Sequence, residues 1–341
     1  MAQPGIKRLR RIQMGAEDES GMAVAATTIW RGMGNTLSDD RVIEEIEEMS
    51  GIIEGPDRTA VTKLFGGLEL AETPLTFEQV QHLLKMGLGG ATTGTADGSG
   101  SGKIYTTNIP TTSVPTAAPY TFEAGDDYEA ERMAYCVPTK INIKGETGQT
   151  AKISATLIGR TVSTNAFTGS LGLPTIEDVL TSKGKIYLDT ISGTLGTTRV
   201  ANSILAFDIT YELNWVPKWT MDGNLYFTFP VYTGHKISGR LTFEHSAAVS
   251  GTGGAKQYFR DQTPRLLRVD LIGNTLTTAG TAYSEKHVIL DLPLQYNKAN
   301  VLSDLDGNDT VVMEFRSRYN DTAAAPKAGR FIVVNELTTA G

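Results

Sequence analysis

Apolar and polar residues alternate most regularly between Ser203 and Glu244. From position 205 to 213 every second residue is apolar: Leu205, Phe207, Ile209, Tyr211 and Leu213. The intervening positions include Asp208, Thr210 and Glu212, and the alternation returns at 237–243 between Ser238 and Glu244. A period of two sends successive side chains to opposite faces of a strand. The pattern therefore predicts an antiparallel sheet with one buried face and one hydrated face.

Similar runs predict strands along most of the remaining chain. A hairpin is predicted at 138–160, where residues 146–149 (ETGQ) have turn chemistry. Residues 221–224 (MDGN) predict a second turn, whereas residues 161–174 show no alternation and are interpreted as a linker. Further strands are predicted at 59–70 with a break at Gly66-Gly67, and at 185–189, 225–231, 265–272, 287–292, 308–319 and 330–337.

Helical spacing is clearest in Leu75–Met86, with Thr76 as a candidate N-cap and Gly87 directly after the last turn. Its predicted buried stripe consists of Phe77, Val80, Leu83 and Leu84. A shorter helix is predicted within Ala247–Arg260. The protein is therefore expected to be mainly β with few helices.

Two stretches do not follow a single pattern. The apolar spacing of Asn35–Met49 slightly favours a helix, but its residues also fit an extended acidic strand. Gly87–Pro119 contains seven glycines between Gly87 and Gly102 and almost no apolar pattern. Unstructured loops longer than about 15 residues are usually functional or disordered. This loop is expected either to fold on a partner or to remain flexible.

Each half of the chain presents a strand, then a helical segment, then closing strands. In the first half these are residues 59–70, 75–86 and 138–160; in the second they are 236–244, 252–260 and the strands at 265–272 and 287–292. No repeat of individual residues accompanies this order, so a structural duplication is a hypothesis. We predict an N-terminal arm at 1–20, a first domain at 21–170 and a second domain at 171–341.

Charge and composition narrow the classes of protein. A net charge of −7 and a pI near 5.3 argue against a nucleic-acid-binding protein, which needs clustered Lys and Arg. Residues 1–170 carry 15 basic and 21 acidic groups, and residues 171–341 carry 16 and 17. The single cysteine, Cys136, excludes an intrachain disulfide. No apolar run approaches the roughly 20 residues of a membrane span, and no signal-peptide pattern is present, so we expect a cytosolic protein without a membrane partner.

Candidate catalytic patterns are absent from the sequence. The histidines are scattered and lie in no zinc motif: His82, His235, His245 and His287. The glycine-rich runs match neither a phosphate-binding loop nor a dinucleotide fingerprint. The acidic segment 304–309 lacks the spacing of a calcium loop and is interpreted as a turn. We therefore predict no enzyme, no catalytic residue, no cofactor and no metal site.

Several segments in order resemble the tail tube (major tail) proteins of long-tailed, non-contractile bacteriophages. Residues 21–34 (GMAVAATTIWRGMG) resemble the beginning of that family, and residues 68–90 (LELAETPLTFEQVQHLLKMGLGG) resemble its sheet-to-helix segment. Residues 140–160 (KINIKGETGQTAKISATLIGR) resemble its hairpin. Residues 203–223 (SILAFDITYELNWVPKWTMDG) and 239–244 (GRLTFE) resemble its second-half sheet. Together the segments extend over roughly residues 15–320.

The resemblance implies two tandem β-sandwich or half-barrel domains, each with a flanking helix, that form a β-barrel ring on oligomerisation. Two domains per chain would make a trimeric, pseudo-hexameric ring, with a hexamer as the alternative. Such rings stack into a hollow tube around a tape-measure protein and meet tail terminator and baseplate proteins. The tube belongs to the virion tail, is assembled in the host cytoplasm, and conducts double-stranded DNA without specific binding. The resemblance also implies that residues 41–49 are extended.

In such a tube the hydrated face of the sheet is expected to line the lumen, with Asp208, Thr210, Glu212, Ser238 and Glu244 as candidate residues. Duplex DNA carries about one negative charge per 1.7 Å, so an acidic or neutral lining would discourage adhesion. The alternative is that this polar face meets solvent on the outside of the ring.

Two segments are candidates for contacts between stacked rings, ordering on assembly. Their candidate residues are Lys7, Arg8, Arg10 and Arg11 in the N-terminal arm, and Gly94, Gly100 and Lys103 in the loop 87–119. A different class of function is a β-sandwich module on a virion surface that binds glycans. Its stacking residues would be Trp215, Trp219 and Tyr232.

Overall fold

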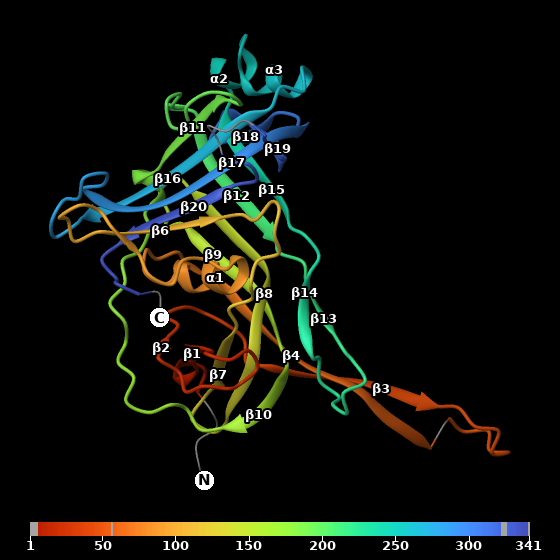
Figure 1. Cartoon of the computed structure of the whole chain (residues 1–341). Coiled ribbons are helices and arrows are strands. Elements are labelled where there is room, and N and C mark those ends of the chain that lie inside the picture. Colours follow the sequence, from red (N-terminus) through yellow and green to blue (C-terminus); the bar gives the residue numbers. More distant parts are fainter. Residues whose placement is uncertain (1–5, 56, 322–325, 340–341) are drawn as a thin grey trace.

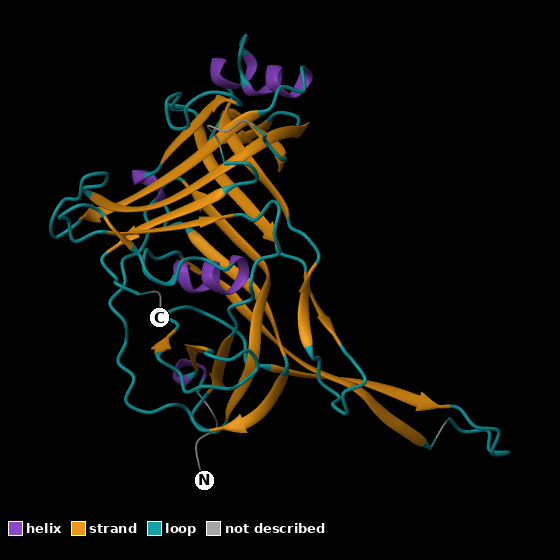
Figure 2. Ribbon diagram, viewed as in Figure 1, coloured by secondary structure: helices purple, strands orange, loops and turns teal. Residues whose placement is uncertain are grey.

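The computed structural model describes residues 6–55, 57–321 and 326–339. The chain is mainly β, as predicted, and its strands pair antiparallel (Figures 1 and 2). Two sheets face each other, and a third, smaller sheet extends from one of them. The strands do not close into a barrel within the described part of one chain.

The larger sheet contains the strand pair that the alternating pattern predicts. Its hydrogen-bonded order is β3 (Ser38–Ile46), β4 (Arg58–Pro74), β9 (Lys152–Gly159), β8 (Ala130–Glu146), β12 (Ile204–Glu212), β15 (Lys236–Glu244) and β19 (Asn308–Ser317). The predicted hairpin at 138–160 is the β8–β9 pair. A short strand, β18 (Ser303–Leu305), forms a hairpin with β19.

The second sheet is joined to the first by one long strand. Its order is β11 (Lys185–Thr190), β16 (Arg265–Thr275), β17 (Glu285–Ala299), β20 (Arg330–Asn335), β6 (Lys103–Asn108) and β5 (Thr95–Ala96). The first part of β17 pairs with β20, and its last residues pair with β19. The sheets enclose a common core, in which the rings of Tyr211 and Phe331 lie 4.7 Å apart between centroids.

The third sheet uses the first residues of β8. It consists of β2 (Thr28–Ile29), β1 (Arg11–Ala16), β7 (Tyr120–Gly125), β8 and β10 (Thr161–Asn165). The prediction of a linker at 161–174 is therefore wrong for its first five residues, because their backbone groups pair with residues 130–134 of β8.

The ambiguous segment Asn35–Met49 forms strand β3 rather than a helix. Its register with β4 runs from Ser38 opposite Gly67 to Ile46 opposite Arg58. All its side chains are exposed or half-buried, so a helical stripe would have had no core to pack against. Strand β4 also continues through Gly66-Gly67, so the predicted break is wrong.

Helix α1 (Val80–Leu88) starts later and ends later than its sequence pattern predicts. Residues 75 and 77 bind the backbone of distant segments, because Leu75 donates to the Ala151 carbonyl and Phe77 to that of Glu177. Thr76 Oγ1 accepts the Gln79 amide at 3.2 Å, which is the bond expected of an N-cap, but it caps the turn before the helix, whose own N-cap is Gln79. The helix ends at Gly89, whose φ of +66° suits glycine, rather than at Gly87. The predicted stripe is buried.

The expectation of an unstructured loop at 87–119 is wrong in part. Strands β5 and β6 lie within it, and β6 pairs along its whole length with β20 near the end of the chain. Alternate side chains of β6, including Tyr105 and Thr107, are buried. The loop is thus held by the chain's own second sheet.

The remaining elements are short. The predicted helical region contains α2 (Ala247–Ser250) and α3 (Ala255–Arg260), which lie at the end of the molecule opposite the β3–β4 hairpin (Figure 1). The predicted strand at 225–231 shortens to β14 (Phe229–Tyr232), which pairs with β13 (Trp215–Lys218). Two 3-10 turns complete the set: η1 (Lys7–Leu9) and η2 (Thr181–Lys183).

Strand pairing connects the two halves of the chain. Residues 206–212 of β12 pair with residues 140–146 of β8, on either side of the predicted boundary at residue 170. The pairing of β6 with β20 likewise joins early and late segments. The division into two tandem domains remains a prediction.

His82 of α1 makes folding stability sensitive to pH. Its side chain is buried beside Tyr120, 3.2 Å from the hydroxyl, and burial lowers the pKa of His82 to about 4. Between about pH 6.5 and pH 4 the unfolded chain binds a proton at this histidine while the folded chain largely does not. We expect the free energy of unfolding to fall by roughly 3 kcal/mol between pH 7 and pH 4 through this group. Urea denaturation across that range measures it.

The matched variants are His82→Gln, which should lose this component of the pH dependence, and His245→Gln at an exposed histidine, which should keep it. Equal pH dependence of wild type and His82→Gln would contradict the assignment.

Candidate functional site

The outer face of the larger sheet carries a broad array of polar side chains, here called the ladder face, interrupted by Ala206 and Val312. Along β12, Phe207, Ile209 and Tyr211 point into the core, so Asp208 and Glu212 point outward. The ladder face consists of Glu69, Glu72, Lys140, Asn142, Lys144, Glu146, Lys152, Ser154, Thr156, Asp208, Thr210, Glu212, Lys236, Ser238, Arg240, Thr242, Glu244, Lys298, Glu314 and Arg316.

Strand register places these side chains in rows across the sheet. One row contains Lys140, Glu212 and Lys236. The next contains Asn142, Thr210, Ser238 and Arg316, and the third contains Lys144, Asp208, Arg240 and Glu314. Directly opposed side chains on one face of an antiparallel pair interact, and opposite charges stabilise the pairing modestly. The first and third rows thus alternate cations with anions, whereas the second row is mostly uncharged.

Asp208 is the best-connected member of the ladder face. Its carboxylate lies 3.0 Å from an Arg240 guanidinium nitrogen and accepts a hydrogen bond of 2.6 Å from the Asn142 amide. The same amide donates to Thr210 Oγ1 at 2.9 Å. Nearby, Lys236 Nζ lies 3.3 Å from a Glu212 oxygen. Two of the five predicted lumen residues, Asp208 and Thr210, therefore belong to one polar network, and Glu212 forms a separate ion pair beside it.

A second ion-pair group lies toward the β4 side of the face. The Glu72 carboxylate contacts the ammonium groups of Lys144 and Lys152, the latter at 2.9 Å. Hydrogen bonding to Lys144, and then to Lys152, lowers the pKa of Glu72. Glu72 therefore stays ionised and offsets one of the two lysine charges.

The ladder face is electrically neutral rather than acidic. Its named residues include seven cations and seven anions. Sequence analysis identified the anions of β12 and β15 but not their basic partners, among them Lys144, Lys236 and Arg240. Their alternation within each strand places them on the polar side, but the strand order that brings them opposite Asp208 and Glu212 is not visible in the sequence.

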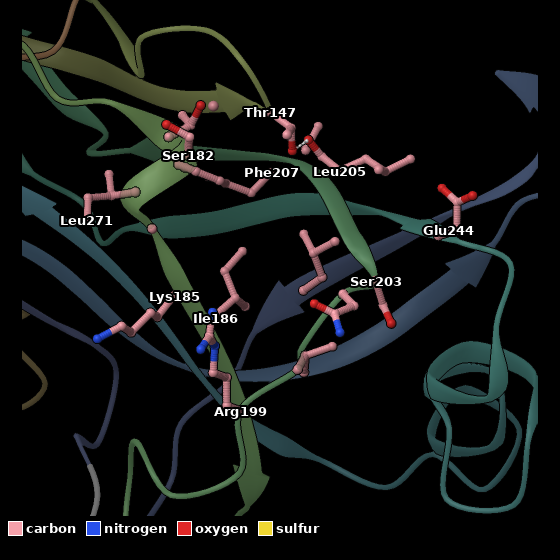
Figure 3. Close-up of a pocket in the computed structure, with 17 residues that line it drawn as sticks. Thr147, Ser182, Lys185, Ile186, Arg199, Ser203, Leu205, Phe207, Glu244 and Leu271 are labelled. Carbon is pink, nitrogen blue, oxygen red and sulfur yellow. Dashed lines mark hydrogen bonds between the residues drawn. The ribbon is translucent and has the colours of Figure 1, made fainter. Parts of the chain in front are cut away.

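Ser238 and Glu244 occupy different parts of this surface. Ser238 lies opposite Thr210 in the middle of the sheet. Glu244 lies at the end of β15, at the rim of a cavity of about 480 Å³ (Figure 3). Apolar Ile186, Phe207 and Leu271 line this cavity, where the two sheets diverge between β11 and β12. Glu244 thus belongs to the ladder face by its strand position but is distant from the Asp208 network along β15.

The basic residues at the N-terminus lie in a groove with apolar walls, here called the basic groove. Lys7, Arg10, Arg11 and Arg31 line this space of about 480 Å³, together with exposed Leu173 and Met33, and Asp178 is its one acidic lining residue. Arg8 lies in the same short turn as Lys7 and is exposed.

The other three inter-ring candidates contact their own chain. A side chain added at Gly94 would meet Lys103 and Tyr105, and one at Gly100 would meet the backbone of Gly280. Lys103 belongs to β6 and pairs with Asn335. The structure therefore does not bring these residues together with the basic residues of the N-terminus. A role between rings remains a prediction for them.

The proposed glycan-stacking residues do not form one exposed platform. Trp215 is buried and donates its indole N–H to the Gly87 carbonyl at 3.0 Å. Tyr232 packs against Trp215 and contacts His235, whereas Trp219 packs against Phe65 and Phe227. A buried indole cannot offer its face to a sugar, so Trp215 acts as a packing residue.

The histidines lie on separate elements with different partners. His235 contacts the Tyr232 hydroxyl, His245 contacts Ser250, and His287 lies 2.7 Å from an Asp270 oxygen. Within residues 6–55, 57–321 and 326–339, no group of three or more His, Cys, Asp or Glu side chains is arranged to hold a metal ion. In the same ranges, none of the helices is long and apolar enough to cross a bilayer.

The Asp208–Arg240 pair should contribute little to stability on its own. The side chains are 24% and 61% exposed, and exposed ion pairs typically contribute 0.2–1 kcal/mol, so we expect a coupling energy below about 1 kcal/mol. A double-mutant cycle of Asp208→Ala and Arg240→Ala in urea, repeated at high salt, measures it. A coupling of several kcal/mol that persists in high salt would contradict this expectation.

The ladder face and the basic groove are thus the two surfaces that the structure assembles from the predicted site residues. In comparisons with known proteins, the chain matches no family model and no curated sequence.

Proposed function

We propose that this chain is a structural subunit of a phage tail tube, whose copies join into rings that stack around a channel for double-stranded DNA. The observation that carries the proposal is the neutral ladder face. A broad, half-hydrated sheet surface on which seven cations and seven anions offset one another offers DNA neither a strong attraction nor a strong repulsion. Such a surface suits a lining past which a polyanion must slide.

Open strand edges support assembly between copies. Among the described residues, β3 pairs only with β4, so one edge of the larger sheet ends in exposed backbone. Unpaired edges favour pairing with another chain, and a closed ring removes them. We propose that the sheets complete a barrel between copies, with two tandem domains per chain and a trimeric ring, a hexamer being the alternative.

In the proposed tube, the tape-measure protein occupies the lumen before DNA passes through it. Tail terminator and baseplate proteins contact the two ends of the tube. The protein would have no catalytic role and would reside in the virion tail after assembly in the host cytoplasm. The glycan-binding alternative loses its main support, because Trp215 is buried.

Electron microscopy of the purified full-length protein tests the proposal directly. We expect rings or hollow filaments of uniform bore under conditions that favour assembly, and native mass spectrometry of single rings should give three copies per ring. A protein that stays monomeric at high concentration, or that forms particles without a central channel, would contradict the tube.

Reversing charge on the ladder face should impair DNA passage without preventing assembly. Asp208→Lys with Glu212→Lys removes two negative charges and adds two positive ones per chain, at positions already flanked by Lys144, Arg240 and Lys236. The resulting basic lining would retain DNA, so we expect tubes of normal appearance with slower DNA ejection from virions carrying the variant.

The matched control is Asp208→Arg with Arg240→Asp, which exchanges the two charges and keeps the face neutral. Normal ejection is expected for this control. Unchanged ejection in the Asp208→Lys, Glu212→Lys variant would remove the ladder face from the lumen and place it on the outside of the ring.

A further inference from the structure

The hairpin of β3 and β4, here called the arm, extends away from the rest of the molecule (Figures 1 and 2). Its first strand has nine residues, which at about 3.3 Å each span roughly 30 Å. Apolar side chains are exposed along the arm and at its tip: Val42, Ile43, Met49, Ile52 and Ile53. Clustered apolar residues that face solvent mark interaction surfaces.

The net charge of the arm equals the net charge of the whole protein. Residues 38–74, from the start of β3 to the end of β4, contain ten acidic and three basic side chains, a net charge of −7. The whole chain has the same net charge, so the other residues contain equal numbers of acidic and basic groups. The arm is therefore an acidic, apolar extension from a body with no net charge.

Few of these acidic groups are neutralised locally. Arg41 lies 2.7 Å from Asp39, and Arg58 contacts Glu48. In the described part of the chain, no cation forms an ion pair with Glu44 or Glu45. A partner for the arm should accordingly combine apolar surface with several cations.

The basic groove has this combination. Leu173 is 70% exposed and Met33 57% exposed beside its four cationic side chains. Its walls are held in place, since the Arg31 guanidinium donates to the Pro174 carbonyl at 3.1 Å and that of Arg11 stacks 3.9 Å from the Phe167 ring. Arginines fixed in this way lose little further freedom when they bind a carboxylate.

The groove cannot be filled by the arm of the same chain. Asn35 and Thr36 line the groove, and β3 begins at Ser38, so the arm is rooted beside the groove. From that root the hairpin runs outward to one side, and its tip lies well away from β1 and β2 (Figure 1). A tip and a groove that match in chemistry but are separated in one chain can meet only between copies.

We infer that the arm of one copy docks in the basic groove of a second copy. The contact joins two different surfaces, so a pair of copies keeps one free arm and one free groove, and the association propagates head to tail. Its role as a junction between stacked rings rests on the proposed tube. The contact itself is a property of two copies of this chain.

Charge reversal with rescue tests this contact in the full-length protein. The arm variant is Glu44→Lys with Glu45→Lys, and the groove variant is Lys7→Glu with Arg10→Glu. Each places like charges on arm and groove, so we expect self-association, measured by sedimentation velocity at low salt, to weaken about tenfold or more. The variant with all four substitutions, and an equimolar mixture of the two separate variants, should both recover association, because each restores opposite charges.

The control is Asp261→Lys with Asp304→Lys, which changes the charge by the same amount near α3 and β18, far from the arm. The inference would be overturned if the arm and groove variants associate as the wild type does, or if they lose association and the combined charges do not restore it. It would also be overturned if the wild type remains monomeric. If wild type associates and rescue succeeds but microscopy shows no channel, the docking stands and the proposed tube fails.

Discussion

The hydrogen-bonded ladder between β8 and β12 is the constraint on which the rest of the structure depends. Ile143 lies opposite Ile209 with both side chains in the core, and the next pair, Lys144 and Asp208, lies on the outer face. A slip of one residue would bring Asp208 into the core and expose Ile209. The same backbone bonds therefore fix the apolar packing and the arrangement of ions on the ladder face. They also join segments from the two halves of the chain.

The alternation of polar and apolar residues was sufficient to predict local structure where the two faces of a strand differ in polarity. The alternation in β12 and β15 predicted the strands, their antiparallel partnership and the outward direction of Asp208, Thr210 and Ser238, all of which the structure confirms. Patterning was insufficient for β6, a short strand rich in threonine, because its partner β20 lies near the other end of the chain. It also misplaced the ends of α1, since backbone bonds from Leu75 and Phe77 to distant residues compete with the first helical turn.

For the candidate surfaces, too, single-strand patterns were predictable from the sequence and the pairing of distant strands was not. The acidic residues of β12 were visible as a periodic pattern, but the neutrality of the face depends on cations from β8 and β15 that only the strand order brings opposite them. The segment 41–49 satisfied two periodicities, and the choice between them is made by pairing with β4 rather than by any property of its own residues. Non-local pairing is thus what the sequence alone did not reveal, whereas single-strand orientation was accessible from it.

The placement of nearly all excess charge on one hairpin has a consequence for how free subunits behave. Electrostatic repulsion between dissolved molecules scales with their net charge and opposes aggregation. Here the body contributes none, so the arm alone supplies the colloidal stability of the monomer. Docking of the arm in the groove of a neighbouring copy would neutralise its charge and so reduce the repulsion between the two copies. The same hairpin would then keep free subunits in solution and, once docked, hold assembled subunits together.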